Sequence, residues 1–316
     1  MRIVYALYMP KVKPLLKWVG GKTQIIQNVL DRFPTTINNY HEPFLGGGSV
    51  LLALLESVER GDIVVTGAVW ASDLNISLIN FYQQIQTNVA EFIGKSIKLK
   101  TEFLALSEED RKFFYYTIRE KYRAETETTL DSAVMFLFLN KTCFRGLYRV
   151  GPNGFNVPYG NYKQPTIFVE ERLRQVSNLI QNVVFTAHSF EHSLAEQMIS
   201  ENDFIYMDPP YAPETSSSFV GYTSSGFPLT LHQKLFAKCR ALKKAGILMS
   251  NSYVPLVKDS FTSPEFVISI VSCRRRINSK KPASRTEEVL IQRGASESTQ
   301  EQLDGEDDVR ELRTTK

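Results

Sequence analysis

Four consecutive residues, Asp208-Pro209-Pro210-Tyr211, directly follow the apolar run Phe204–Met207. A carboxylate, two prolines and an aromatic ring can bind a planar exocyclic amine, because the prolines lack an N–H and their carbonyl oxygens can accept hydrogen bonds. If the apolar run is a buried strand, Asp208 lies at its carboxyl end, where open α/β sheets bind ligands. An ordinary Pro-Pro turn, with Asp208 as a turn residue, is the alternative. The four residues alone leave both interpretations open.

A glycine triplet, Gly46–Gly48, lies between a strand expected at residues 39–44 and a helix expected at residues 49–58. Such a loop lets a ligand approach the backbone and points free N–H groups at it. Leu51 occupies the place of the third glycine of the dinucleotide fingerprint, which disfavours a dinucleotide. Asp73 is spaced to accept hydrogen bonds from ribose hydroxyls. Each feature alone could be a structural turn, but their order favours a nucleoside cofactor.

An open sheet is needed to position these residues. Strand, glycine loop, helix, strand and acid form the first half of a nucleotide-binding βαβ unit, so we expect an α/β fold with a Rossmann-like sheet. Residues 14–30 are helical in pattern, and Thr230 with Gln233 fits a capping box at the start of a later helix. Further strands are expected at residues 63–70, 183–185, 203–207, 247–250, 266–271 and 288–291.

The α/β pattern lapses between residues 77 and 168, where amphipathic segments rich in Arg and Lys precede a turn-rich stretch. We therefore expect a catalytic domain formed by residues 1–76 and 169–294. Residues 77–168 are expected to form an inserted, mostly helical module that carries a β-hairpin. The polar, acidic residues 295–316 are expected to be a disordered tail.

The turn-rich stretch interleaves basic and apolar side chains, namely Lys141, Phe144, Arg145, Leu147, Tyr148 and Arg149. Arginines on a hairpin can contact guanine O6 and N7 in a DNA major groove, and aromatic rings can stack on bases. A solvated basic loop is the alternative for this stretch alone. Lys280, Lys281 and Arg285 could add contacts to phosphates.

Gly20-Gly21-Lys22-Thr23 has the ending of a phosphate-binding P-loop. That motif needs a glycine where this chain has Leu16, and the segment precedes the first expected strand rather than following it. We therefore exclude an ATPase.

The bulk composition is that of a globular protein, with 316 residues, 43% hydrophobic and 22% charged, enough for a full α/β core and an insertion. The net charge is +3, and because the tail is acidic the remaining chain is more basic than this total. Three separated cysteines and four scattered histidines predict no zinc site and a reduced intracellular protein. The apolar residues 3–9 predict neither a signal peptide nor a membrane helix.

Five motifs occur in an order that resembles a known family: Leu16–Lys22, Glu42–Val50, Ser72–Asn75, Phe155–Gly160 and Asp208–Tyr211. The order is similar to that of the α-group, Dam-type DNA adenine-N6 methyltransferases. The resemblance covers roughly residues 14–292. It implies a sequence-specific enzyme that transfers a methyl group from S-adenosylmethionine to N6 of adenine in double-stranded DNA, without a metal.

The resemblance also implies roles for particular residues. The implied catalytic residues are Asp208, Pro209, Pro210 and Tyr211. The implied cofactor-binding residues are Trp18, Lys22, Glu42, Phe44, Gly46, Gly48, Asp73 and Asp208. The implied DNA-binding residues are Lys17, Arg145, Leu147, Arg149, Pro158 and Tyr162. On this hypothesis the target adenine is flipped out of the duplex, Tyr211 stacks on it, and Asp208 with the Pro209 carbonyl accepts its amino hydrogens.

The resemblance also bears on the DNA sequence that is recognised and on possible partners. Members that recognise GATC usually have asparagine where this chain has Arg145, and residues 143–147 look more like the subgroup associated with CATG. Either short palindrome is a candidate target. A restriction endonuclease acting on the same site is a candidate partner, and such enzymes commonly act as monomers inside the cell.

Two other classes of protein could share some of these features. Amino-methyltransferases acting on RNA or on protein glutamine share the fold, but the glutamine enzymes usually begin the tetrapeptide with asparagine and lack a basic insertion. A DNA-binding regulator without catalysis would have no reason to retain Asp208, Tyr211, Asp73 and the glycine loop together. These features favour the DNA methyltransferase.

Overall fold

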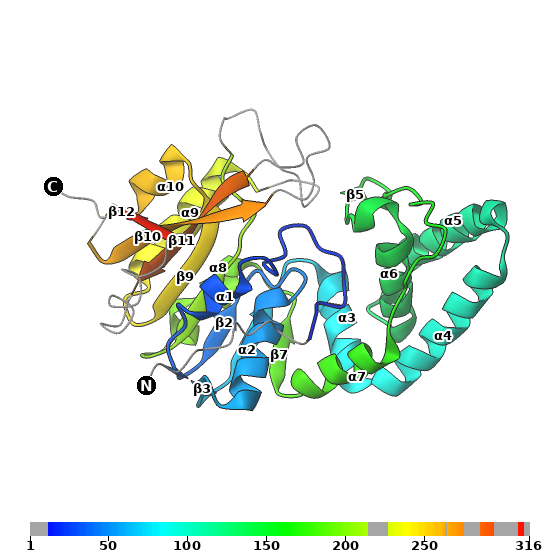
Figure 1. The fold of residues 1–316 in the computed structure, drawn as a ribbon, viewed down its shortest axis with the longest axis horizontal. Coiled ribbons are helices and arrows are strands. Elements are labelled where there is room, and N and C mark those ends of the chain that lie inside the picture. Colours follow the sequence, from blue (N-terminus) through cyan, green and yellow to red (C-terminus); the bar gives the residue numbers. More distant parts are fainter. Residues whose placement is uncertain (1–11, 214–226, 263, 275–284, 294–308, 313–316) are drawn as a thin grey trace, which may run out of the picture.

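The computed structural model describes residues 12–213, 227–262, 264–274, 285–293 and 309–312. In this part of the chain, an eight-stranded mixed sheet packed with helices lies beside a mostly helical part (Figure 1). The strand order is β12-β10-β11-β9-β8-β2-β4-β7. The strands of the sheet are β2 (Tyr40–Glu42), β4 (Val69–Ser72), β7 (Val183–Thr186), β8 (Phe204–Met207), β9 (Gly246–Ser252), β10 (Phe266–Arg274), β11 (Arg285–Arg293) and β12 (Val309–Leu312).

The strands from β9 to β7 in this order are parallel to one another. Their carboxyl ends therefore meet at one edge of the sheet, and the residues that follow β2, β4 and β8 there are Pro43, Asp73 and Asp208. The parallel strands β2, β4, β7 and β8 are short, with three or four residues each, and every residue of β8 is buried, as expected for a strand covered on both faces.

The strand β11 brings a residue from late in the chain to the same edge. It pairs antiparallel with β9, and Glu288 lies opposite Ser252, the last residue of β9. Because the two strands run in opposite directions, Glu288, close to the start of β11, lies at the carboxyl edge of the parallel strands.

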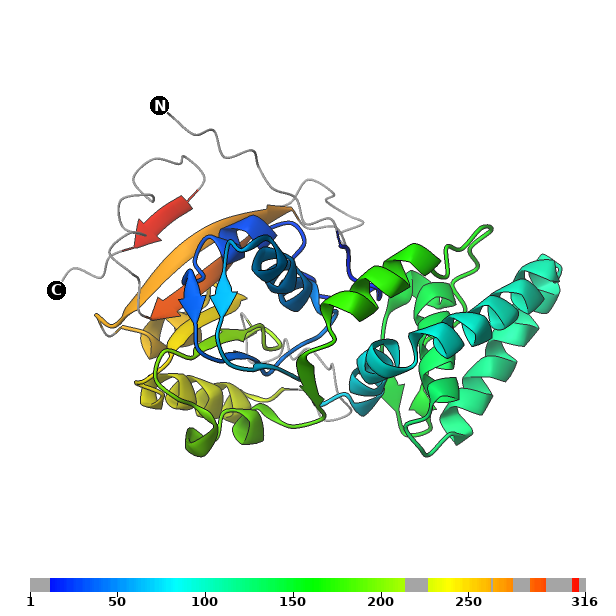
Figure 2. The same ribbon diagram turned by 90° about the horizontal axis from the view of Figure 1, so that it is seen from below.

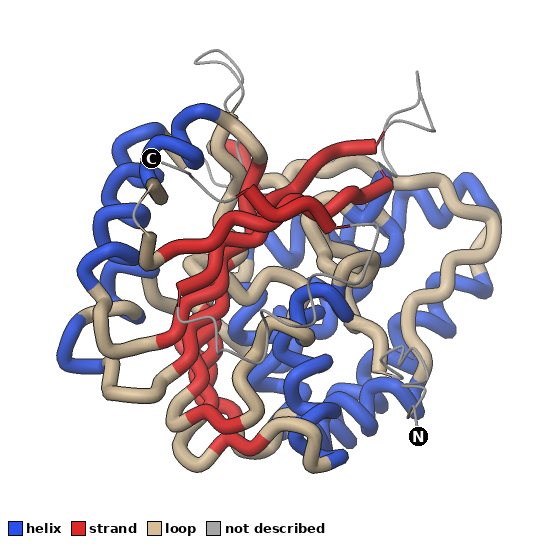
Figure 3. The backbone as a smooth tube through the Cα atoms, turned by 60° about the vertical axis from the view of Figure 1, so that its left-hand side comes forward, coloured by secondary structure: helices blue, strands red, loops and turns tan. Residues whose placement is uncertain are grey.

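Helices cover both faces of the sheet, as Figures 2 and 3 show from two further directions. Alternate residues of β8 serve two hydrophobic cores: Phe204 and Tyr206 face one, and Ile205 and Met207 face the other. The first core includes residues of α1 (Ile26–Leu30), α2 (Ser49–Arg60) and α7 (Glu170–Leu179). The second includes residues of α8 (Phe190–Ser193), α9 (Leu229–Ala241) and α10 (Pro255–Ser260), and the short η2 (Glu196–Met198) lies between β7 and β8.

The helical part follows β4 and precedes α7. It contains α3 (Ile76–Thr87), α4 (Val89–Ala105), α5 (Glu108–Ala124), α6 (Leu130–Thr142), the single turn η1 (Phe144–Gly146) and an antiparallel hairpin of β5 (Val150–Gly151) and β6 (Gly154–Phe155). A third core, with Phe103, Tyr115 and Phe138 fully or almost fully buried, holds these elements together. Helix α6 is mostly buried and begins with a capping box of Thr129 and Ser132.

Two local predictions were wrong. The helix expected over residues 14–30 is only α1, because Gly20 adopts a left-handed φ of 84°, although Ile25, Val29 and Leu30 are buried as the pattern predicts. The capping box at Thr230 is not formed either. Helix α9 begins at Leu229 with Pro228 as its N-cap, so Thr230 already lies within the first turn.

The run 63–70 divides into two strands. Val64–Val65 forms β3 and pairs with β1 (Thr36–Ile37) in a separate two-stranded sheet, while β4 joins the main sheet. Gly67 lies at the break, where a Cβ would collide with the side chain of Asn39.

One segment of the predicted tail is a strand in the structure. Val309–Leu312 forms β12, because the edge of β10 offers unpaired backbone groups to a further strand. The other residues of the tail lie outside the described part of the chain. Lys280 and Lys281, expected to contact phosphates, also lie outside it, and Arg285 begins β11. In the described ranges we find no helix with the length and apolar character to cross a bilayer.

Candidate active site

The predicted catalytic tetrapeptide follows β8 and is held against the end of β9. The backbone N–H of Ala212 donates to the Oδ1 of Asn251 at 3.0 Å, and the N–H of Ser252 donates to the same oxygen at 2.9 Å. The Ser252 hydroxyl in turn donates to the Ala212 carbonyl. Residues 208–211 are therefore fixed at the carboxyl edge of the sheet by a neighbouring strand.

Four side chains form a compact charged cluster at this edge. The Nζ of Lys22 lies 2.8 Å from Oδ1 of Asp208 and 4.0 Å from Oε2 of Glu288. It also donates to the Gly20 carbonyl at 2.7 Å and lies 4.9 Å from the centre of the Tyr211 ring. The Tyr211 hydroxyl donates to Glu288 Oε2 at 2.8 Å. Lys22 is only 3% exposed and Asp208 19%, so water screens their attraction weakly.

Burial raises the pKa of Asp208 to about 6, and the Lys22 ammonium beside it opposes this rise. Asp208 is therefore mostly ionised at neutral pH but close enough to its pKa to take up a proton. Burial and the neighbouring carboxylates Asp208 and Glu288 hold the pKa of Tyr211 well above its usual value, so its phenol stays a hydrogen-bond donor.

Glu42, expected to bind the cofactor, lies buried at the end of β2. Burial raises its pKa to about 8, and the Asp208 charge adds to this, while the Tyr40 hydroxyl, which donates at 2.6 Å, opposes it. Glu42 is therefore mostly protonated at neutral pH, which leaves Asp208 and Glu288 as the anionic partners of Lys22.

The glycine loop follows β2 and packs between two aromatic side chains. A Cβ on Gly47 would lie 2.8 Å from the Cβ of Trp18, and one on Gly48 would lie 2.7 Å from the hydroxyl of Tyr82. Tyr82 donates to the Gly47 carbonyl at 2.8 Å. Gly46 and Gly48 have positive φ values, 50° and 67°, which favour glycine. Glycine is therefore needed here for close packing against Trp18 and Tyr82, as well as for access of a ligand to the backbone.

Asp73 ties the glycine loop to the end of β4. Its Oδ2 accepts from the Gly46 N–H at 3.0 Å and its Oδ1 from the Asn75 N–H at 2.9 Å. Burial raises the pKa of Asp73, and these N–H groups oppose the rise. Each carboxylate oxygen can accept a second hydrogen bond. Leu74 beside it is 63% exposed, so an apolar surface adjoins the acceptors, which suits the ribose and base of a nucleoside.

Trp18 and Phe44 belong to different aromatic groups. Trp18 stacks on Tyr148, with ring centres 5.6 Å apart, and so joins the glycine loop to the helical part. Phe44 stacks on Phe190 of α8, with ring centres 5.7 Å apart. Phe190 was not predicted as a site residue, and Tyr148 was expected only as an aromatic of the basic hairpin, not as a neighbour of Trp18.

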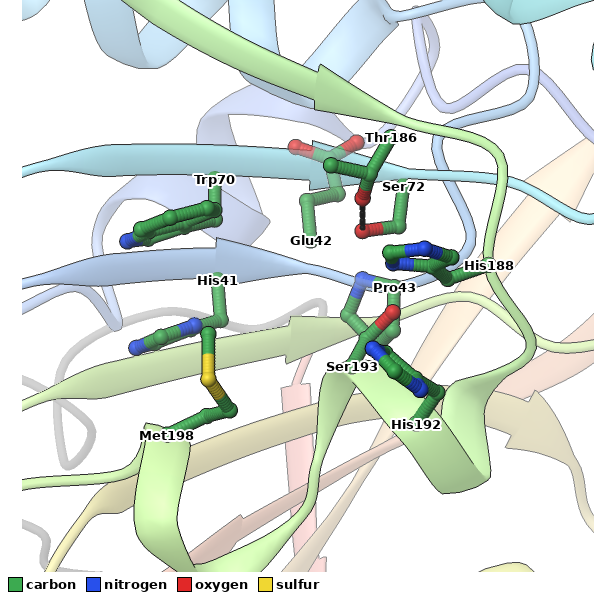
Figure 4. Close-up of a pocket in the computed structure, with 10 residues that line it drawn as sticks. All are labelled: His41, Glu42, Pro43, Trp70, Ser72, Thr186, His188, His192, Ser193 and Met198. Carbon is green, nitrogen blue, oxygen red and sulfur yellow. Dashed lines mark hydrogen bonds between the residues drawn. The ribbon is translucent and has the colours of Figure 1, made fainter.

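A pocket lies near the ends of β2, β4 and β7, beside α8 (Figure 4). The Ser72 and Thr186 hydroxyls share a hydrogen bond of 2.8 Å in its wall, and the rings of His188 and His192 lie 4.0 Å apart. Glu42 is the one predicted cofactor residue among those that line it. Within the described chain, no cluster of three His, Cys, Asp or Glu side chains could hold a metal ion.

Three of the predicted DNA-binding residues contact one another. The Nζ of Lys17 lies 4.6 Å from the centre of the Tyr162 ring, and the Tyr162 hydroxyl accepts from the backbone N–H of Arg145 at 3.0 Å. Arg145 is exposed and adopts a left-handed φ of 57°. The backbone of Lys17 is fixed by two hydrogen bonds of 2.8 Å to the Asn140 side chain on α6.

The other three predicted DNA-binding residues, Leu147, Arg149 and Pro158, flank the hairpin of β5 and β6. The Pro158 carbonyl accepts from the Phe144 N–H at 2.8 Å, and Leu147 is half-buried. Arg149 is exposed and donates to Oδ1 of Asn156 at 2.6 Å.

Lys141 adds a further basic side chain to this region. Burial lowers its pKa to about 8, and the charges of Lys17 and Arg172 lower it further. Three mutually repelling cations suit an anionic partner such as a phosphate backbone.

The chain is similar in sequence to a defined family over most of its length. Residues 18–277 match the model of the D12 class N6 adenine-specific DNA methyltransferases. The chain belongs to this family. It is 40% identical over 254 residues to the type II methyltransferase M.MjaIII of Methanocaldococcus jannaschii, covering 77% of this chain and 85% of that protein.

Two further relatives are similar over most of their length. The DNA adenine methylase of Haemophilus influenzae is 31% identical, with 81% of this chain and 86% of that protein covered. The type II methyltransferase M1.LlaDCHI of Lactococcus lactis subsp. cremoris is 30% identical, with 87% and 92% covered.

The predicted enzyme class and methyl donor are confirmed by these findings, and the predicted Rossmann-like fold agrees with the parallel strands of the sheet described above. The protein is an adenine-specific DNA methyltransferase that uses S-adenosylmethionine, and its substrate is DNA.

Glu288 bonds to Tyr211 and Asn251 bonds to Ala212, although the sequence pattern predicted neither as a site residue. Glu288 was recognised only as the start of a strand. Its signal was a charged residue ahead of the run Val289–Ile291, which is completely buried.

Proposed function

We propose that the enzyme flips its target adenine out of the duplex and holds it between Asp208 and Tyr211. The observation that carries this proposal is the cluster at the carboxyl edge of the sheet. There an ionised, weakly solvated carboxylate lies beside an aromatic ring whose hydroxyl is already bonded to another group. Such a pair can accept hydrogen bonds from an amino group and stack on the ring that carries it.

The chemistry required is activation of a weak nucleophile, since the lone pair of adenine N6 is delocalised into the ring. The Asp208 carboxylate and the Pro209 carbonyl accept the two amino hydrogens, which concentrates the lone pair on nitrogen. S-adenosylmethionine supplies an electrophilic methyl group on a sulfonium leaving group. Asp208 then takes the proton that N6 loses as it gains the methyl group. Positioning and fixed charges provide most of the acceleration.

The cofactor site that we propose extends from the glycine loop to Asp73. Asp73 holds the ribose hydroxyls with the acceptor positions that the backbone leaves open. The Gly46–Gly48 backbone, Trp18 and Phe44 form the walls, and Lys22 balances the charge of the carboxylates. Glu42, the last residue of β2, precedes this loop in its neutral form.

We propose that residues 77–168 form the target-recognition module and that residues 1–76 and 169–294 form the catalytic domain. Lys17, Arg145 and Tyr162 make the centre of the DNA-contacting surface, with Leu147, Arg149 and Pro158 along the hairpin. Support comes from their mutual contacts and from the cationic group around Lys141. Such a surface should give DNA binding that weakens steeply with salt.

The target that we propose is a short palindrome, CATG or GATC, with Arg145 as a determinant of the choice. Two relatives carry the name type II methyltransferase, and this supports a role as the protective enzyme of a restriction-modification system. We further propose that the enzyme acts as a monomer, and inside the cell, where its DNA substrate is.

Sequencing of the methylated bases in a host that expresses the enzyme tests target choice. We expect N6-methyladenine in one palindrome, and resistance of the host DNA to an endonuclease that cuts there. The variant Arg145→Asn should methylate other sites as well or instead, because a bidentate donor to guanine is lost. An unchanged set of methylated sites would show that Arg145 does not determine the choice.

A further inference from the structure

Glu288 lies outside every motif of the cofactor, DNA and catalytic sites, yet its carboxylate contacts two residues of the catalytic cluster. It accepts the Tyr211 hydroxyl hydrogen at 2.8 Å and lies 4.0 Å from the Nζ of Lys22. The strand β11 delivers it there, opposite Ser252 at the end of β9. Its side chain is 20% exposed, so both contacts are shielded from bulk water.

Lys22 lies between two carboxylates. Its Nζ is bonded to Asp208 at 2.8 Å, while Glu288 is 4.0 Å away, so a small side-chain movement would exchange one partner for the other. The Gly20 carbonyl holds the ammonium near both. In the arrangement seen here, one oxygen of Asp208 is engaged by Lys22. An incoming amino group needs that carboxylate as an acceptor.

We propose that Glu288 is a positioning residue for methyl transfer. It holds the Tyr211 ring through the phenol and offers Lys22 a second carboxylate, which releases Asp208 to the amino group of the base. The inference rests on the roles proposed above for Asp208 and Tyr211.

A purely structural role fits the position poorly. The next three residues of β11, Val289, Leu290 and Ile291, are completely buried and apolar, and they attach the strand to the core. A carboxylate at low exposure costs free energy unless its partners compensate. Among the described residues Glu288 is partnered by Tyr211 and Lys22, and its charge also raises the pKa of Asp208.

The variant Glu288→Gln separates charge from shape, because the amide oxygen can still accept from Tyr211. We expect kcat to fall by about tenfold, because the neutral amide no longer attracts the Lys22 ammonium and accepts more weakly from Tyr211 than a carboxylate does, with KM for DNA and cofactor little changed. The acid limb of the kcat–pH profile should move to lower pH, since removal of the Glu288 charge lowers the pKa of Asp208. Glu59→Gln, at an exposed site at the end of α2, is the matched control and should change neither.

A second pair of variants tests the contact with the phenol. Glu288→Ala should lower kcat more than Glu288→Gln and reduce the fluorescence rise of 2-aminopurine placed at the target position, which reports base flipping. In a Tyr211→Phe background, Glu288→Ala should cost less than in the wild type, because the shared hydrogen bond is already absent.

Two results would overturn the proposal. One is a wild-type kcat and pH profile in Glu288→Gln. The other is a loss confined to thermal stability or KM, with an unmoved acid limb, which is the result of a structural role. If Asp208→Asn also keeps full activity, the proposed function itself fails, whereas an inactive Asp208→Asn with a normal Glu288→Gln overturns this inference alone.

Discussion

Replacement of Lys22 by methionine should shift the pH dependence of methyl transfer. Lys22 and Asp208 are 2.8 Å apart, and Coulomb's law gives about 1.5 kcal/mol at the dielectric constant of water and about 6 kcal/mol at a value of ~20. These free energies correspond to about one and about four pKa units. The pKa of Asp208, about 6 with Lys22 present, should therefore rise to about 7 or above in Lys22→Met.

The assay is kcat against pH with saturating cofactor and duplex DNA. At pH ~7 the ionised fraction of Asp208 should fall from about nine tenths to about half or less, and the rate should recover as the pH rises toward ~9. Lys244→Met, an exposed lysine after α9, is the matched control. If the acid limb of Lys22→Met coincides with that of the wild type, the ion pair does not set the protonation of Asp208 and the reasoning fails.

Two further predictions concern packing and acid stability. Gly47→Ala should raise the Kd for the cofactor and lower the free energy of unfolding by about 1–3 kcal/mol, because the added Cβ would press on Trp18. Calorimetric titration measures the Kd and thermal melting measures the stability. Unchanged values of both would contradict the close packing. Burial lowers the pKa of His232 to about 4. Between pH ~6.5 and ~4 the unfolded chain therefore binds a proton at His232 that the folded chain does not bind. The free energy of unfolding should fall by about 1.4 kcal/mol for each pH unit of acidification in this range. Denaturant unfolding at several pH values should show this slope, and His232→Leu should reduce it; an equal slope in the variant would rule out this source.

Local sequence pattern was sufficient for the parts of the site that follow strands. The apolar run Phe204–Met207 is buried on both faces, and such a run predicts a central strand with Asp208 at its end. The glycine triplet predicts a turn before a helix, and α2 begins at Ser49 as expected. Asp73 follows β4 for the same reason.

Contacts between distant segments could not be predicted from such patterns. Glu288 and Tyr211 are 77 residues apart, and their meeting depends on the register of β11 against β9, which no local signal fixes. The packing of Trp18 on Tyr148 likewise depends on how the helical part docks on the sheet. The predicted capping box at Thr230 was wrong because the helix begins at Leu229, with Pro228 as its N-cap. The local motif at Thr230 and Gln233 could not show that the helix begins before it.

The most direct test of the account is single-turnover methylation of duplex DNA by the wild type and Asp208→Asn, with N6-methyladenine measured by mass spectrometry after digestion. The account predicts that the variant binds DNA and cofactor but transfers the methyl group about 10²- to 10⁴-fold more slowly, since it has lost its proton acceptor. A rate in Asp208→Asn close to that of the wild type would contradict it.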